Sequence, residues 1–135
     1  MRRSGFLPLL SLLPLLVLAG CGWVGVSDRT HKPDGFLLHG YVSAAAASTG
    51  SPCTSSAKDI HAGAEVKITD DRGKSLATGA LGDGVPAGAR CNFPFEISNV
   101  PGASAGVVVL VGAQPAASFT TSDLREGRAA VVEAP

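Results

Sequence analysis

The sequence predicts an all-β fold for residues 35–135, an antiparallel β-sandwich of about seven strands. Short runs in which apolar and polar residues alternate recur along this part of the chain, and segments rich in Gly, Pro or Asp separate them. No convincing stretch there has the 3.6-residue period of an amphipathic helix. Because a half-buried sheet cannot stand in water alone, two sheets facing each other are the expected solution.

The first strand and a hairpin are the clearest local predictions. A period of two begins at Gly35, with Phe36 and Leu38 on one face and His39 on the other. Residues 64–69 and 76–81 form two further alternating runs. The residues between them, Asp-Asp-Arg-Gly-Lys at 70–74, are turn formers, so the two runs predict a hairpin.

Two loops and a third alternating run follow from the middle of the chain. Residues 44–57 are rich in Ala, Ser and Gly, and 82–90 are rich in Gly and Pro, so both are predicted to be loops. In 91–97, Cys, Phe, Phe and Ile share one face of a strand. Pro94 interrupts this run, so the strand is expected at a sheet edge, or with the side of Pro94 that lacks an N–H facing outward.

The C-terminal third contains shorter elements. The continuous apolar run 107–111 is flanked by glycines and predicts a strand buried on both faces. Residues 118–121 predict a short strand, 122–127 a turn or a single helical turn, and 129–133 the last strand.

The N-terminus has the layout of a secretory signal peptide. Arg2 and Arg3 precede an apolar stretch over 6–18, and small residues follow it. The apolar stretch is shorter than the roughly 20 residues that span a bilayer, and it contains two prolines. Residues 1–20 are therefore predicted to be a signal peptide, with a membrane anchor or a buried helix as the alternative.

The residues at the cleavage point, Leu18-Ala19-Gly20-Cys21, closely resemble the lipobox of bacterial lipoproteins. The resemblance implies cleavage between Gly20 and Cys21 after the Cys21 sulfur receives a diacylglycerol chain. Two acyl chains make such anchoring stable, and acylation of the new amino terminus can follow. Residues 21–34 would then be a flexible, lipidated tether to the domain. Secretion with Cys21 as a free thiol is the alternative.

Cys53 and Cys91 are the two cysteines left in the mature chain. An even pair on the oxidising side of a membrane indicates a disulfide. The alternatives are two buried thiols or a metal pair, and the chain lacks the Cys-x-x-Cys spacing that favours metal.

Charge and motifs argue against several functions. The formal net charge is 0, which leaves no basic excess for nucleic acid. His31, His39 and His61 show no ligand spacing, and a transition-metal site would require the last two to converge with Asp59. The acidic residues at 70, 71 and 83 lack a calcium-loop pattern, and no Gly-x-Ser-x-Gly motif is present. We therefore expect no cofactor, no metal site and no enzymatic activity.

Two motifs beyond residue 59 carry a resemblance of fold. The hairpin reads G-x-x-V-x-I-x-D-x-x-G-x-x-L-A from Gly63 to Ala77, and the later strand reads C-x-F-x-F-x-I-x-x-V-P from Cys91 to Pro101. In layout this is similar to transthyretin-like and carboxypeptidase-regulatory-like domains of secreted bacterial proteins. The chain also resembles small, uncharacterised lipoproteins of actinobacteria. These resemblances imply an accessory or binding module without catalytic residues.

The anchor, the tether and the sandwich together lead to a functional expectation. We expect a non-catalytic protein of the cell envelope, held to the membrane by the lipid on Cys21 and facing outside the cytoplasm. Its sandwich would bind another envelope protein or a wall polymer. The alternatives are a carrier of a small apolar ligand between the sheets and, least favoured, an enzyme.

Overall fold

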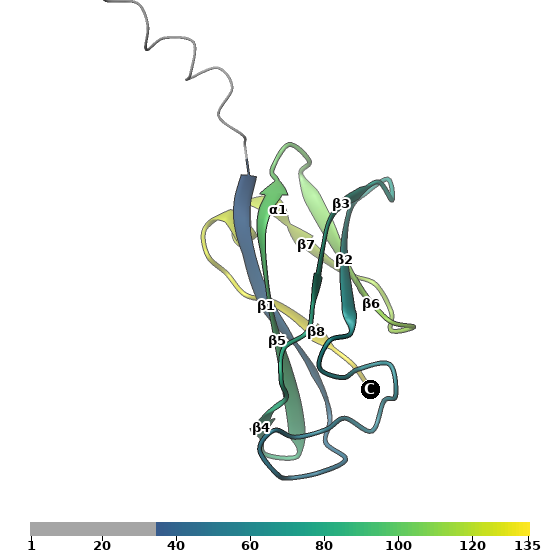
Figure 1. Cartoon of the computed structure of the whole chain (residues 1–135). Helices are drawn as coiled ribbons and strands as arrows, with labels where there is room; N and C mark the ends of the chain where they lie inside the picture. The colour runs from purple at the N-terminus through teal and green to yellow at the C-terminus, as the bar shows by residue number, and fades with distance from the viewer. Residues whose placement is uncertain (1–34) are drawn as a thin grey trace, which may run out of the picture. The chain divides into compact units, whose positions relative to one another are not determined.

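The computed structural model describes residues 35–135, which form a two-layer β-sandwich with one short helix (Figure 1). The elements in chain order are β1 (Gly35–Ala45), β2 (Glu65–Asp70), β3 (Ser75–Ala80), β4 (Val85–Ala87), β5 (Arg90–Pro101), β6 (Gly106–Val111), β7 (Ala117–Thr120), α1 (Thr121–Arg125) and β8 (Ala130–Glu133). The predicted signal peptide 1–20, its cleavage point at Gly20 and Cys21, and the tether 21–34 lie outside the described residues.

The two sheets have four strands each, in the orders β4-β5-β1-β8 and β3-β2-β6-β7. The predicted all-β sandwich is confirmed, with eight strands in place of about seven. The additional strand is β4, which lies inside the region predicted to be a loop. All three of its residues are exposed, so its sequence has no alternation of apolar and polar residues by which to recognise a strand.

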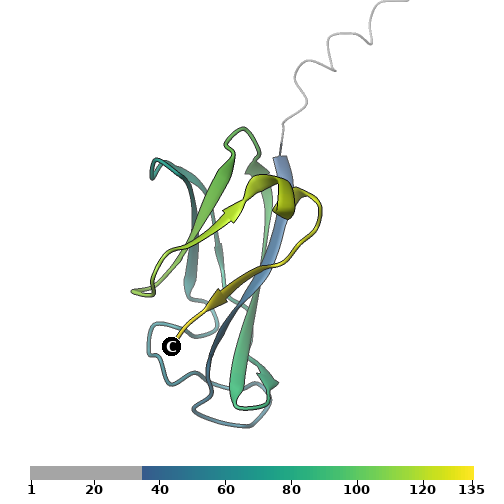
Figure 2. The ribbon, with the colours of Figure 1, turned by 180° about the vertical axis from the view of Figure 1, so that it is seen from behind.

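One strand pair is parallel, whereas the prediction was of an antiparallel sandwich. β1 pairs with β8 in parallel, with Gly40 opposite Ala130 and Val42 opposite Val132. The chain passes from β7 in one sheet through α1 to β8 in the other (Figure 2). This connection crosses between the layers, and it brings the last strand alongside the first in the same direction.

The core lies between the sheets and follows the predicted alternation. In β1, Leu38 and Val42 are fully buried, and in β5 the side chains of Phe93, Phe95 and Ile97 are at most 5% exposed. β2 contributes its buried valine and isoleucine from the predicted inward face. The β2–β3 hairpin is also confirmed, with Gly73 in the left-handed region at φ 86° inside its turn.

β5 is an interior strand, which corrects the first of the two expectations for it. It pairs with β1 on one side and with β4 on the other, but β4 reaches only as far as Asn92. Beyond that point the carbonyl of Pro94 accepts a hydrogen bond from the Gly82 N–H at 2.7 Å. A residue in a strand directs its nitrogen and its carbonyl to the same side, so the missing N–H of Pro94 faces away from β1. The second expectation for Pro94 therefore holds.

β6 is not buried on both faces, so that prediction is wrong. Val107, Val109 and Val111 are buried, whereas Val108 and Leu110 are only half-buried. A sandwich has two layers, so the outer face of each sheet meets solvent. The apolar run of β6 therefore reflects the β-propensity of valine as much as its burial.

Candidate functional site

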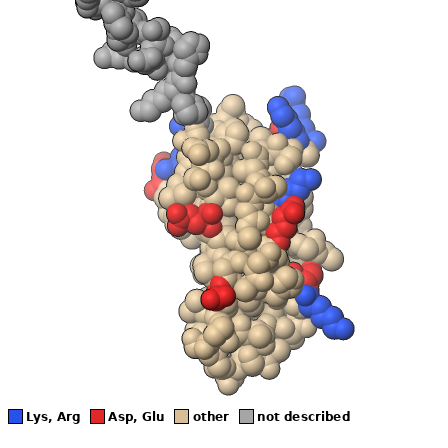
Figure 3. Space-filling model, in the orientation of Figure 1, with Lys and Arg blue, Asp and Glu red and all other residues tan. Residues whose placement is uncertain are grey.

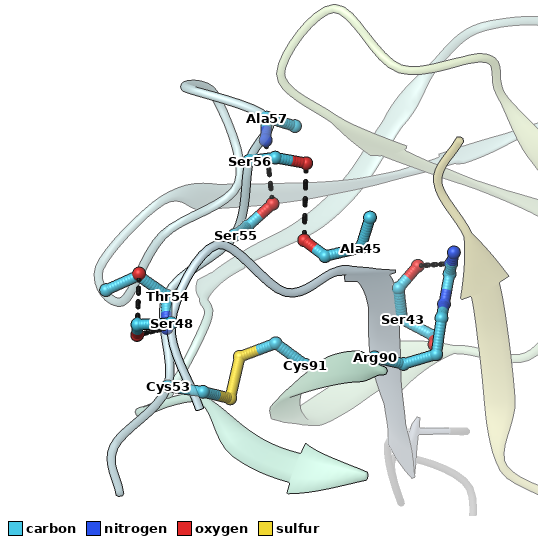
Figure 4. The surroundings of a disulfide bond; sticks show 10 residues. All are labelled: Ser43, Ala45, Ser48, Cys53, Thr54, Ser55, Ser56, Ala57, Arg90 and Cys91. Atoms are coloured by element: carbon cyan, nitrogen blue, oxygen red, sulfur yellow. Dashed lines mark hydrogen bonds between the residues drawn. A yellow bond between two sulfur atoms is a disulfide. The ribbon is translucent and has the colours of Figure 1, made fainter. Parts of the chain in front are cut away.

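A disulfide joins Cys53 to Cys91, as the sequence predicted (Figure 4). Its Cα atoms are 5.9 Å apart, and both cysteines are buried, at 3% and 0% exposure. Cys91 lies on the inward face of β5, and Cys53 belongs to residues 46–64, which connect β1 to β2 and are called the long loop below. The bond therefore fastens the middle of the long loop to the core of one sheet.

Hydrogen bonds hold the first half of the long loop in the same place. The Cys53 N–H donates to the Gly84 carbonyl at 3.1 Å, next to the disulfide. The Thr54 N–H donates to Ser48 Oγ at 3.0 Å, and the Ser56 N–H donates to the Ala45 carbonyl at 3.0 Å. Figure 4 shows the contact between Ser48 and Thr54 next to Cys53, and the hydrogen bond from the Ser56 hydroxyl to the Ala45 carbonyl. These hydrogen bonds satisfy backbone groups in a segment that has no long strand partner.

The second half of the long loop is tied to the opposite sheet. The Asp59 carboxylate accepts hydrogen bonds from the Ala113 N–H at 2.8 Å and from Gln114 Nε2 at 3.1 Å. These two donors lie in the connection between β6 and β7. The bond from the Ala113 N–H, followed by that from Gln114, lowers the pKa of Asp59 below its ordinary value, and the charge of His61 adds to the effect.

Ile60 gives the long loop an apolar anchor. Its side chain is 1% exposed and belongs to the core cluster, although its neighbours Asp59 and His61 are not buried. The loop is thus held by a disulfide, by a carboxylate and by a buried isoleucine. Connecting segments are usually the most mobile part of a fold, and these three attachments restrict this one.

A pocket of about 340 Å³ lies beneath the long loop. Its walls come from the long loop, from Asp83 and Gly84, and from Phe93 of β5. Cys53, Ile60 and Phe93 are the buried apolar residues among them. Three titratable side chains, Lys58, His61 and Asp83, also line it. Volumes of roughly 300–1,000 Å³ with apolar walls and a few polar groups are typical of small-molecule sites.

The pocket lies at the long-loop end of the sandwich and not between the two sheets. The sheets meet closely where Gly79 of β3 faces β5, since a Cβ atom on Gly79 would come within 2.7 Å of Ile97 Cγ1. Figure 3 shows one face of this region, where charged side chains are few and scattered.

The histidines and Asp59 do not converge on one site. His39, on the outer face of β1, lines a different surface recess, together with Glu96. The Nδ1 atom of His61 lies 2.9 Å from the Ala62 carbonyl oxygen, with which it shares a hydrogen bond. Within residues 35–135, no three His, Cys, Asp or Glu side chains gather closely enough to hold a metal ion. His31 falls outside the described residues.

The acidic residues considered from the sequence have separate places. Asp70 closes the hairpin turn, because its Oδ1 accepts hydrogen bonds from the N–H groups of Arg72 and Lys74, each at 2.9 Å. This is the turn-forming role expected of aspartate. Asp83, in contrast, lines the pocket beneath the long loop.

Sequence reasoning missed the residues that build this pocket. Lys58 and Ile60, which line the pocket, belong to no functional motif in the sequence. One signal was available: Ile60 is an isolated large apolar residue in a stretch of Ala, Ser and polar residues. Such a residue indicates that its segment packs on a core.

Comparisons with known proteins identify no relative of this chain. In the part of the chain that is described, 35–135, no helix has the length and hydrophobicity needed to cross a bilayer. Neither a scan against protein-family models nor searches of curated proteins and of solved structures find a match to this chain.

Proposed function

We propose that this protein is a non-catalytic, lipid-anchored binding module that faces the outside of the cytoplasm. The observation that carries the proposal is the buried Cys53–Cys91 disulfide. Disulfides of this kind form and persist in oxidising compartments, and they are rare in the cytosol. A lipobox-like sequence ending at Cys21 supplies the means of export and of anchoring.

The sandwich architecture supports the role of an accessory domain. The hairpin motif occupies β2 and β3, and the motif from Cys91 to Pro101 occupies β5. These are the segments that resemble transthyretin-like and carboxypeptidase-regulatory-like domains, and we propose that relationship as the origin of the fold. In that case the domain serves to bind and to position, and it performs no chemistry.

The long loop is the surface that we propose for binding. Its three attachments hold it in one conformation before a partner arrives, which reduces the entropy lost on binding. The pocket beneath it provides a concave feature with both apolar and charged groups. The partner is then another envelope protein or a wall polymer that contacts this end of the sandwich.

Mass spectrometry and fractionation of the full chain test the location. We expect the wild-type protein in the membrane fraction, with its N-terminus at a diacylglycerol-modified Cys21 and with Cys53 and Cys91 oxidised. The Cys21→Ser variant should lose the lipid mass and leave the membrane fraction after processing. A cytosolic protein with Met1 intact and both remaining thiols reduced would overturn the proposal.

Site-specific photo-cross-linking in intact cells tests the binding surface. A photoreactive residue in place of Thr54, an exposed position of the long loop, should form adducts with an envelope protein or with wall polymer. The same residue in place of Thr78, an exposed position of β3, is the matched control and should form few. Equal adducts at the two positions, or none at either, would contradict a role for the long loop.

A further inference from the structure

Two opposite charges flank the apolar pocket beneath the long loop. Lys58 belongs to the loop itself, and Asp83 belongs to the connection between β3 and β4, so the charges come from different walls. Both residues are exposed. Within residues 35–135, neither side chain has an ion-pair or hydrogen-bond partner, so both are available to a ligand.

The apolar lining of the pocket has a buried part and an accessible part. Ile60, Phe93 and Cys53 are 1%, 2% and 3% exposed, so they back the pocket and offer a ligand almost no surface. The apolar residues that a ligand can touch are Pro52, Ala57 and Ala62, called the floor below, and Lys58 and Asp83 are exposed in the same lining. A ligand that enters would place an apolar group against this floor and its charged groups against the two charged side chains.

We infer that the pocket binds an apolar α-amino acid as a zwitterion. The carboxylate would face Lys58, the ammonium group would face Asp83, and the apolar side chain would lie on the floor formed by Pro52, Ala57 and Ala62. This inference rests on the proposed binding role and names the class of ligand for the same site.

Charge complementarity selects the zwitterion over simpler ligands. A purely anionic ligand would be attracted by Lys58 but repelled by Asp83, and a purely cationic ligand would meet the reverse. A neutral apolar ligand would use the floor alone. In an α-amino acid one carbon atom carries the carboxylate, the ammonium group and the side chain, so a single small molecule supplies all three groups.

L-Phenylalanine and two derivatives test the inference by NMR titration of the full, lipidated chain in detergent micelles. N-acetyl-L-phenylalanine lacks the ammonium charge, and L-phenylalanine amide lacks the carboxylate. We expect L-phenylalanine to bind more tightly than either derivative by about two- to fivefold in Kd, the range for exposed ion pairs. The perturbed resonances should be those of the long loop and of Asp83 and Gly84.

Two charge variants should each remove one part of this selectivity. In Asp83→Asn, N-acetyl-L-phenylalanine and L-phenylalanine should bind equally, because the partner of the ammonium group is gone. In Lys58→Gln, L-phenylalanine amide and L-phenylalanine should bind equally. Lys74→Gln, at the exposed hairpin turn, is the control that should leave all three affinities unchanged.

A third variant blocks the pocket without altering the buried core. Ala62 is exposed and lines the pocket, so Ala62→Trp should fill it and abolish binding of all three probes. Equal binding of the three probes to the wild-type protein, binding that survives Ala62→Trp, or no binding at all would overturn the inference. In these cases a membrane-bound protein that still cross-links through position 54 would leave the proposed function intact.

Discussion

The carboxylate of Asp59 accepts hydrogen bonds from the side-chain amide of Gln114 at 3.1 Å, although 55 positions separate the two residues in sequence. With the bond from the Ala113 N–H, this contact ties the long loop to the connection between β6 and β7. Asp59 is thus a structural link between the loop over the pocket and the sheet that does not carry the disulfide.

This link predicts a pH dependence of stability. Because the folded-state pKa of Asp59 lies below its unfolded value, the carboxylate stabilises the fold above the unfolded pKa, and the contribution is lost as pH falls through the folded pKa. Asp59→Ala should therefore lower the urea midpoint at pH 7, and the difference from wild type should shrink below about pH 4.

Gln114→Ala provides the companion measurement for this link. It removes one donor to Asp59 but leaves the Ala113 N–H, so it should reduce the pH-dependent part without abolishing it. An Asp59→Ala deficit of equal size at pH 7 and pH 3 would contradict the assignment.

Removal of the disulfide should cost much of the stability of the domain. The bonded cysteines are 38 positions apart, and the chain-entropy model assigns a loop of this length about 4 kcal/mol. The Cys53→Ser/Cys91→Ser variant should lose about that much of its free energy of unfolding in urea, and reduced wild type should behave alike. Cys21→Ser is the control and should unfold as wild type does. An unchanged transition in the presence of reductant would refute the prediction.

Gly40 is expected to be essential for the parallel pairing of β1 with β8. A Cβ atom there would collide with the Ala130 carbonyl and come within 3.0 Å of the Ala130 Cα. Gly40→Ala should destabilise the fold by about 1–3 kcal/mol, and hydrogen exchange of the β8 amides should accelerate most. At Gly50 the nearest atom to an added Cβ is 4.0 Å away, so Gly50→Ala is the control. Equal exchange in the two variants would argue against close packing at Gly40.

Arg90 links β1 to the residue that follows β8 through two carbonyl groups. Its Nη2 atom donates to the Ser43 and Ala134 carbonyls, both at 2.6 Å, and its Nε donates to Ser43 Oγ at 3.1 Å. Lysine carries a single ammonium group on a flexible stem and cannot reproduce this fork. Arg90→Lys should cost about 1–3 kcal/mol in unfolding free energy and expose the Ala134 amide to exchange.

An exposed arginine provides the comparison for this prediction. Arg72 lies in the hairpin turn, and Arg72→Lys should leave the stability of the protein unchanged. Wild-type stability in Arg90→Lys would show that the fork contributes nothing beyond its charge.

Features that depend on neighbouring residues could be predicted from the sequence. The β2–β3 hairpin was predictable because two alternating runs flank a turn that contains Gly73. The inward face of β5 was predictable because its apolar residues recur at every second position. The cysteine pair could be counted from the sequence, and the structure places the two sulfur atoms within bonding distance.

Features that depend on distant parts of the chain required the tertiary structure. β4 has no buried residue and exists only because β5 offers it hydrogen-bonding partners. The number of exposed faces of β6 depends on how many layers the fold has, which a run of valines does not encode. The parallel pairing of β8 follows from a crossover that begins in the other sheet.

The sequence alone determined the alternating residues of β1, β2 and β5, the position of the principal hairpin and the cysteines that could pair. Alternation and turn chemistry are properties of short continuous segments, and cysteines can be counted without knowledge of the fold. The tertiary structure decided the neighbour of each strand, the burial of Ile60 and the meeting of Lys58 with Asp83 at one pocket. Those properties come from contacts between separate segments, whose packing no local period specifies.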